Sequence, residues 1–165
     1  MKAPAMTSAT SEQQAITEIC AAHGSRPDAL LEILHDVQRD RGYIEEWTLP
    51  VIAKALNLSR AEVHGVVSFY HDFRREAPGR HVVKICRAES CQAMGTADLC
   101  RHAERRLGTS IGSTSSDRQF TLDAVYCLGN CALSPAVMID GRVHGRVDRE
   151  RFDELVAGMD GTAAS

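Results

Sequence analysis

The chain has 165 residues, of which 44% are hydrophobic and 25% charged, a composition typical of globular proteins. The formal net charge of −3 argues against a nucleic-acid partner, which would favour a basic surface. No stretch approaches the roughly 18 apolar residues of a membrane span. Residues 1–10 lack the apolar core of a secretory signal and predict a disordered leader, and residues 161–165 predict a loose tail. We therefore expect a cytoplasmic protein without a membrane partner.

The first half of the chain has helical periodicity. Four amphipathic segments follow one another, and Gly42 suits the end of the second. Short amphipathic helices must bury their apolar stripes against one another, so residues 11–73 predict a small helical bundle. The four predicted starts carry capping residues or a proline in the first turn: Ser11 with Gln14, Ser25 with Pro27, Thr48 with Pro50, and Ser59 with Glu62.

The segment 74–80 (RREAPGR) contains adjacent Pro and Gly and predicts a domain boundary. Beyond it, the order of expected elements is strand, helix, loop, strand, hairpin and helix. This order predicts an α/β domain with a mixed sheet over residues 81–159. The elements are strands at His81–Cys86 and Phe120–Cys127, a helix at Ala97–Leu107, a loop at Thr109–Arg118, a hairpin turning at Asp140-Gly141, and a helix capped by Asp148.

Four of the six cysteines form two pairs. Cys86 and Cys91 are spaced C-x4-C, and Cys127 and Cys131 are spaced C-x3-C. Each pair starts at the end of an expected strand and continues into an expected loop, where thiolates from a rigid sheet can meet at one centre. A [2Fe–2S] cluster needs four thiolates. The spacing fits a structural zinc site equally well, so the spacing alone leaves both open.

Other cysteine chemistry fits the sequence less well. Disulfides are rare in the cytoplasm, a thioredoxin-type dithiol needs C-x-x-C, and a Rieske centre needs histidines beside the cysteines. Cys20 and Cys100 fall on apolar faces of expected helices, where a free cysteine behaves as a small buried hydrophobic residue.

The blocks VVKICRAESCQAMG and AVYCLGNCALSPAVMIDG resemble the thioredoxin-like [2Fe–2S] ferredoxins, which include the 24-kDa-type subunit of respiratory complex I. ILHDVQRDRGYI and LNLSRAEVHGVVSFYHDF resemble the helical N-terminal extension of those subunits. The resemblance covers residues 16–159. It implies that Cys86 and Cys91 hold one iron and that Cys127 and Cys131 hold the other. It also suggests a cis peptide bond at Pro135.

Within this family, CRAESCQAMG is similar to the gamma subunit of soluble, molybdenum-containing, NAD-dependent formate dehydrogenases. That similarity implies a non-catalytic subunit that exchanges single electrons with the FMN of a flavin- and NAD-binding partner. A larger partner with molybdenum and Fe–S centres would oxidise formate. This chain has neither G-x-G-x-x-G nor a P-loop, so we expect FMN, NAD and the molybdenum cofactor only on partners. The alternatives are the same subunit in complex I or an NAD-linked hydrogenase, and a zinc-stabilised adaptor without a redox role.

Overall fold

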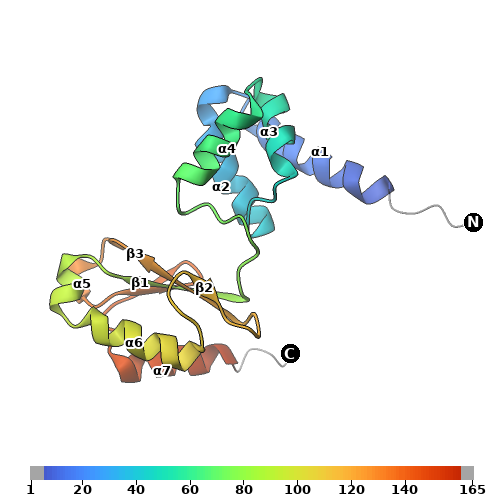
Figure 1. Ribbon diagram of the computed structural model, residues 1–165. Coiled ribbons are helices and arrows are strands. Elements are labelled where there is room, and N and C mark those ends of the chain that lie inside the picture. Colours follow the sequence, from blue (N-terminus) through green and yellow to red (C-terminus); the bar gives the residue numbers. More distant parts are fainter. Residues whose placement is uncertain (1–5, 161–165) are drawn as a thin grey trace, which may run out of the picture. The chain divides into compact units, whose positions relative to one another are not determined.

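A computed structural model describes residues 6–160, with side chains over residues 11–159. The described chain forms two compact units that meet at the bond between Ala77 and Pro78. Figure 1 shows the first unit as helices alone and the second as a sheet with helices. The predicted tail and the first five residues of the predicted leader lie outside the described residues. Over residues 6–160, no helix is both long enough and apolar enough to cross a bilayer.

The first unit is a bundle of short helices whose apolar stripes form one core. Helices α1 and α3 contact each other, as do α3 and α4. Ile16, Ile33 and Ile52 are fully buried at the centre of this core. The elements are α1 (Met6–Ala22), the 3₁₀ turn η1 (Pro27–Ala29), α2 (Leu30–Arg41), α3 (Thr48–Leu56) and α4 (Arg60–Phe69).

Two of the predicted helix ends are confirmed. The Ser59 hydroxyl accepts a hydrogen bond from the Glu62 backbone N–H, and the Glu62 carboxylate accepts one from the Ser59 N–H, which completes the capping box of α4. Gly42 ends α2 with a φ of 82°, and its N–H donates to the carbonyl of Gln38. Such left-handed C-caps favour glycine because it has no Cβ.

Two other predicted starts are wrong. Helix α1 begins at Met6, so Ser11 lies inside the helix and not at its N-cap, and residues 6–10 of the predicted leader are helical. Ser25 has a φ of 50° and precedes η1, after which α2 begins at Leu30 without a side-chain cap. In both cases a serine with suitable spacing predicted the start of a helix, but the helix begins at another residue.

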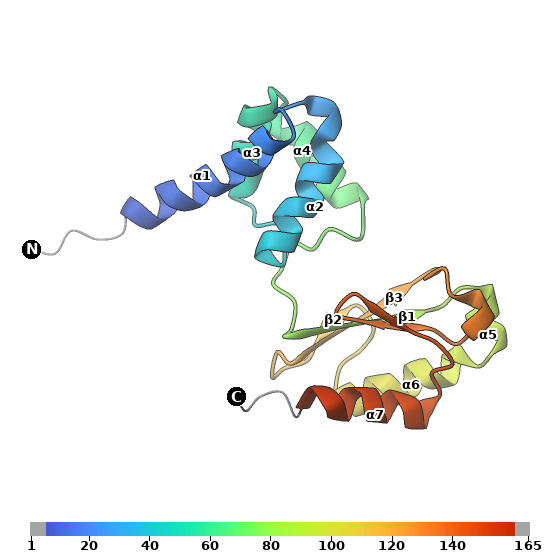
Figure 2. The ribbon, with the colours of Figure 1, turned by 180° about the vertical axis from the view of Figure 1, so that it is seen from behind.

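The second unit is a five-stranded mixed sheet in the order β2-β3-β1-β4-β5. Figures 1 and 2, which view the sheet from opposite sides, agree that α6 and α7 lie along one of its faces. Strands β1 and β3 are parallel, and the other neighbours are antiparallel. The strands are β1 (His81–Cys86), β2 (Ser113–Thr114), β3 (Phe120–Val125), β4 (Val137–Ile139) and β5 (Arg142–His144), and the helices are α5 (Glu89–Ala93), α6 (Thr96–Leu107), η2 (Cys131–Leu133) and α7 (Arg149–Asp160).

The predicted α/β class and mixed sheet are confirmed. Asp140 and Gly141 turn the β4–β5 hairpin with φ values of 48° and 82°, and the Asp148 carboxylate accepts the Arg151 N–H at the start of α7. The predicted loop at Thr109–Arg118 contains the short strand β2, which pairs with β3. The core under the sheet includes the fully buried Val83, Ile85, Ala103, Leu122, Phe152 and Val156.

Candidate metal centre

The sheet topology brings three segments of the chain to one edge. Parallel pairing sets Cys86, the last residue of β1, opposite Val125, the last residue of β3. Strand β4 runs antiparallel to β1 and begins at this same edge, with Val137 opposite Ile85. The carboxyl ends of two strands and the segment before a third therefore meet there, and each of these segments carries cysteine.

The first thiol pair is buried. Cys86 and Cys91 are each 2% exposed, and the interaction between their thiols raises the pKa of Cys86 and lowers that of Cys91. Cys91 was expected in a loop, but it lies in the five-residue helix α5, which turns it back towards the end of β1. The hydroxyl of Thr96, at the start of α6, donates to the carbonyl of Cys86 at 2.9 Å and fixes this corner.

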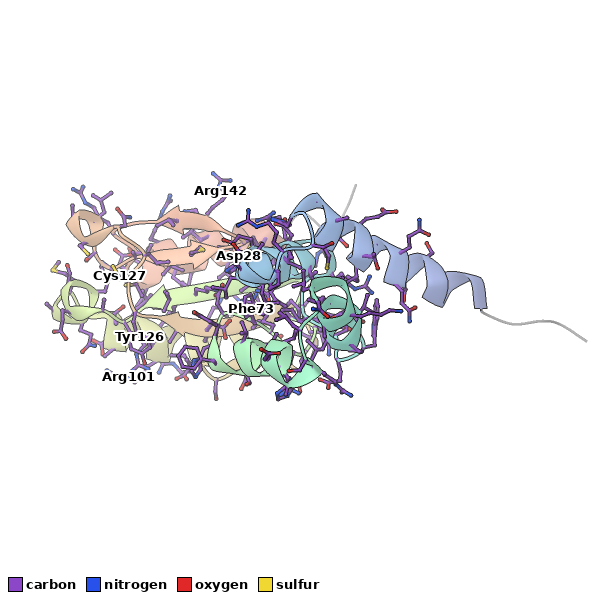
Figure 3. All side chains as sticks on the ribbon, turned by 90° about the horizontal axis from the view of Figure 1, so that it is seen from above. Asp28, Phe73, Arg101, Tyr126, Cys127 and Arg142 are labelled. Atoms are coloured by element: carbon purple, nitrogen blue, oxygen red, sulfur yellow. The ribbon has the colours of Figure 1, made fainter. Side chains whose placement is uncertain are left out.

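The second thiol pair is exposed. Cys127 and Cys131 both face solvent, and Cys127 raises the pKa of Cys131. Cys127 lies two residues after the end of β3 and has a φ of 147°, a conformation that costs a residue other than glycine about 1–3 kcal/mol. The N–H of Gly129 donates to Cys127 Sγ at 3.3 Å. Figure 3 shows Cys127 beside Tyr126 at the end of the sheet unit that carries α5.

Backbone N–H groups and one hydroxyl surround the buried sulfurs. Burial raises the pKa of Cys86, an effect that the backbone groups of Ala88 and Leu128 partly offset. Burial also acts to raise the pKa of Cys91, but hydrogen bonds from Ser134, Ala136 and Cys86 outweigh it, so the pKa of Cys91 is lowered. Cys91 is therefore the member of this pair in which the thiolate is favoured.

The two pairs are electrostatically linked. The hydrogen bond and the charge of Cys127 raise the pKa of Cys131, and the charge of Cys91 raises it further. The four predicted ligands are thus two interacting pairs at one edge. Among the described side chains, no three His, Cys, Asp or Glu residues are placed to hold a single metal ion.

The other two cysteines, Cys20 and Cys100, are buried in the helical core and beneath the sheet, as predicted.

The sequence did not reveal the groups that contact these sulfurs. Ser90 and Ser134 lie 44 positions apart, yet their hydroxyl oxygens are 2.8 Å apart beside Cys91. The only local signal was the Ser-Pro dipeptide before β4. The peptide bond between Ser134 and Pro135 is cis, as the resemblance suggested.

Comparison with known proteins agrees with this architecture. The family model of the thioredoxin-like [2Fe-2S] ferredoxins matches residues 16–160, which include both units and all four paired cysteines. The chain belongs to the thioredoxin-like [2Fe–2S] ferredoxin family. Membership implies one [2Fe–2S] cluster, so the zinc-stabilised adaptor has no support from the family.

Several relatives are subunits of NADH-quinone oxidoreductase. The chain is 37% identical over 128 residues to the E subunit of NADH-quinone oxidoreductase from Pseudomonas aeruginosa, covering 78% of this chain and 77% of that protein. It is 34% identical to the same component of Escherichia coli K12 over the same length. A counterpart from Rhizobium meliloti is 31% identical over 144 residues, which cover 87% of this chain and 86% of that protein.

A solved structure shares the fold. The H2-reduced NAD+-reducing [NiFe]-hydrogenase matches 81% of this chain with a TM-score of 0.71 and 26% identity. This chain spans only 22% of that hydrogenase chain. The thioredoxin-like ferredoxin fold predicted from sequence is confirmed. The chain is a [2Fe–2S] electron-transfer subunit of the type found in NADH-quinone oxidoreductase and NAD+-reducing hydrogenase.

The residues at the sheet edge fit a [2Fe–2S] cluster chemically. Four thiols form two pairs, which matches the requirement for two soft ligands on each of two irons. The N–H of Gly129 donates to Cys127 Sγ, and backbone groups lower the pKa of Cys86, Cys91 and Cys131 against other effects, so the surroundings would stabilise the negative charge of bound thiolates. The donor set is therefore suited to the cofactor that the family implies.

Proposed function

We propose that Cys86 and Cys91 hold one iron of the [2Fe–2S] cluster and that Cys127 and Cys131 hold the other. The observation that carries this proposal is the convergence of two interacting thiol pairs at one sheet edge. All four cysteines lie within the predicted domain at 81–159, and the predicted helical bundle at 11–73 contributes none.

When bound, the cluster supplies a one-electron carrier. The residues of this chain bury one side of the site and stabilise the charge on the ligands. Buried Cys86 and Cys91 keep water from one side of the site, and the N–H of Gly129 and the backbone around Cys86 stabilise negative charge on sulfur. The exposed pair Cys127 and Cys131 leaves the other side open to a redox partner.

The surroundings of the thiols favour a protein partner. Tyr126, Met94 and Leu133 lie one to three positions from a paired cysteine and are 73%, 60% and 39% exposed. Large apolar side chains that lie exposed together on one surface are typical of protein interfaces. We propose that this rim docks a flavin- and NAD-binding subunit and brings the cluster within electron-transfer reach of its FMN.

We further propose that the parent assembly is an NAD-dependent formate dehydrogenase in the cytoplasm, with a larger subunit that carries molybdenum and Fe–S centres. The segment CRAESCQAMG, similar to the gamma subunits of such enzymes, supports this assignment. Free thiols suit a reducing compartment. The second candidate is the same role in complex I or an NAD-reducing hydrogenase, which the identities of 37% and 26% to relatives in those enzymes favour.

The test is to purify the tagged chain anaerobically within its native complex and follow the cluster by EPR after each of three reductants. For a formate dehydrogenase we expect formate to reduce the cluster and NAD+ to reoxidise it, while H2 has no effect. Reduction by H2 without reduction by formate would assign the subunit to a hydrogenase. Reduction by NADH alone would assign it to the complex I type.

A further inference from the structure

The Ser134 hydroxyl lies between the two thiol pairs, within hydrogen-bond distance of one thiol, one carbonyl and one hydroxyl. Ser134 is 9% exposed; its oxygen accepts a hydrogen bond from the Cys91 thiol at 3.5 Å, and its hydroxyl donates to the carbonyl of Cys131 at 2.9 Å. Once Cys91 loses its proton to act as a ligand, only Ser134 can donate across the first of these contacts. It is also 2.8 Å from the hydroxyl oxygen of Ser90. A hydroxyl has one proton to donate, so its neighbours decide which acceptor receives it.

The Ser90 hydroxyl can determine which acceptor receives the Ser134 proton. It donates to the Cys131 carbonyl at 3.2 Å and lies within hydrogen-bond distance of Ser134. With Ser90 donating to either acceptor, the Ser134 proton is free to point at Cys91 Sγ. A thiolate attracts it more strongly than a neutral carbonyl, because charge-assisted hydrogen bonds are roughly twice as strong as neutral ones.

We propose that Ser134 is a positioning residue that donates a hydrogen bond to the Cys91 thiolate and thereby raises the reduction potential of the centre, and that Ser90 keeps the Ser134 proton in that direction. This inference rests on the proposed function, because it requires Cys91 to be a ligand. Reduction by one electron adds one negative charge to the centre and breaks no bond. A donor on a ligand sulfur stabilises that added charge, so the reduced state gains more than the oxidised state.

The other sulfur contacts differ in kind. Gly129 and Ala136 reach Cys127 and Cys91 through backbone groups, which are present whatever the side chain. The donation from Ser134 depends on its side chain and can be removed by substitution. A side-chain donor beside a buried ligand is therefore a position at which sequence can adjust the potential without altering the ligands.

The experiment is an EPR-monitored redox titration of the full chain, loaded with its cluster anaerobically, in five forms: wild type, Ser134→Ala, Ser134→Thr, Ser90→Ala and, as the matched control, Ser113→Ala on an exposed position of β2. We expect Ser134→Ala to lower the reduced-to-oxidised ratio at a fixed potential by roughly tenfold, which equals about 59 mV for a one-electron couple. Ser90→Ala should shift the ratio in the same direction by less. Ser134→Thr, which keeps the hydroxyl, should stay close to wild type, as should Ser113→Ala.

Two further readouts separate this role from a purely structural one. In D2O, pulsed EPR of the reduced wild type should show one strongly coupled exchangeable deuteron that Ser134→Ala lacks. The double variant Ser90→Ala/Ser134→Ala should match Ser134→Ala alone, because both substitutions remove the same donation.

Equal midpoints in wild type, Ser134→Ala and Ser90→Ala would overturn the inference while leaving the proposed function intact. If Ser134→Ala fails to load the cluster, Ser90→Ala decides: a lowered midpoint supports the inference and an unchanged one overturns it. Failure of the wild type itself to hold a [2Fe–2S] cluster would instead overturn the proposed function.

Discussion

The helical unit contains a half-buried polar network around Glu45, the sheet unit contains another around the paired thiols, and the two differ in how many hydrogen bonds their members make. In the helical unit, the Glu45 carboxylate accepts hydrogen bonds from Arg41 at 2.8 Å, Tyr43 at 2.9 Å and Trp47 at 2.9 Å. Burial acts to raise the pKa of Glu45, but these three donors outweigh it and lower the pKa. The network is complete within the chain.

The thiols of the sheet unit lack such strong hydrogen-bond partners among the described residues. Their sulfurs make only long hydrogen bonds: Cys127 Sγ accepts from the N–H of Gly129 at 3.3 Å, and the Cys91 thiol donates to the hydroxyl oxygen of Ser134 at 3.5 Å. Thiols are weak hydrogen-bonding groups but strong ligands of soft metals once deprotonated. The Glu45 network stabilises the fold with hydrogen bonds inside the chain, whereas the four thiols can still bind a metal cofactor.

The largest effect expected is loss of the cluster from Cys127→Ser. A serine oxygen is a poorer iron ligand than a thiolate, so the iron content should fall roughly tenfold or more, by analogy with the loss on removing even indirect support for a metal site. The matched control is Cys100→Ser, which changes a buried cysteine outside the two pairs. Equal losses of iron in both variants would show that the ligand assignment is wrong.

Gly145→Ala should disturb the site without touching a ligand. A Cβ on Gly145 would lie 2.5 Å from the Leu133 Cβ and 2.8 Å from the Asn130 amide nitrogen, both in the segment that carries Cys131. Overpacking of this kind costs about 1–3 kcal/mol. We expect a lower unfolding midpoint in denaturant and faster loss of cluster absorbance to a chelator.

The control for that substitution is Gly158→Ala in α7, where an added Cβ meets open space. Alanine there should leave cluster retention unchanged and raise stability by about 0.5–1 kcal/mol, because glycine is a poor helix residue. Unchanged retention in Gly145→Ala as well would mean that the β5 end does not support the thiol segment.

Glu45→Gln should weaken the helical unit and spare the redox centre. The amide keeps the size of the side chain but loses the charge that Arg41, Tyr43 and Trp47 share, so we expect a loss of about 1–3 kcal/mol in unfolding free energy. The cluster midpoint potential should not change. A shifted potential would contradict the separation between the two networks.

The pH dependence of the helical unit gives a smaller effect of defined sign. The folded pKa of Glu45 lies below its ordinary value, so the unfolded chain binds the proton at higher pH than the folded chain. The stabilisation is fully present above the ordinary pKa and is lost as the pH falls through the folded one. Thermal unfolding from pH 7 downwards should show this acid loss in wild type and a weaker one in Glu45→Gln.

Local signals predicted much of the fold. The box at Ser59 and Glu62 and the turn at Asp140-Gly141 act through hydrogen bonds and dihedral angles within a few residues, so their sequence is sufficient to identify them. Helix α5 and strand β2 were missed because five and two residues are too short to show a period. The start of α1 was misplaced because Ser11 has good capping chemistry inside a segment that continues as helix.

The ligands of the site were predictable from the sequence, but the groups around them were not. The four cysteines stand out by type and spacing, and the resemblance indicated what they bind. The contact between Ser134 and Cys91 spans 43 positions and exists only because β1 and β4 pair, so no local pattern could reveal it. Which sulfurs are buried likewise depends on how α5 turns Cys91 back under the edge of the sheet.

The central claim is that two thiol pairs of the sheet unit hold one [2Fe–2S] cluster. The most direct measurement is the iron and acid-labile sulfide content of the anaerobically purified chain, together with its EPR spectrum after dithionite reduction. We expect about two irons and two sulfides per chain and a rhombic S = 1/2 signal. A colourless chain with one zinc, unchanged by reconstitution with iron and sulfide, would contradict the account.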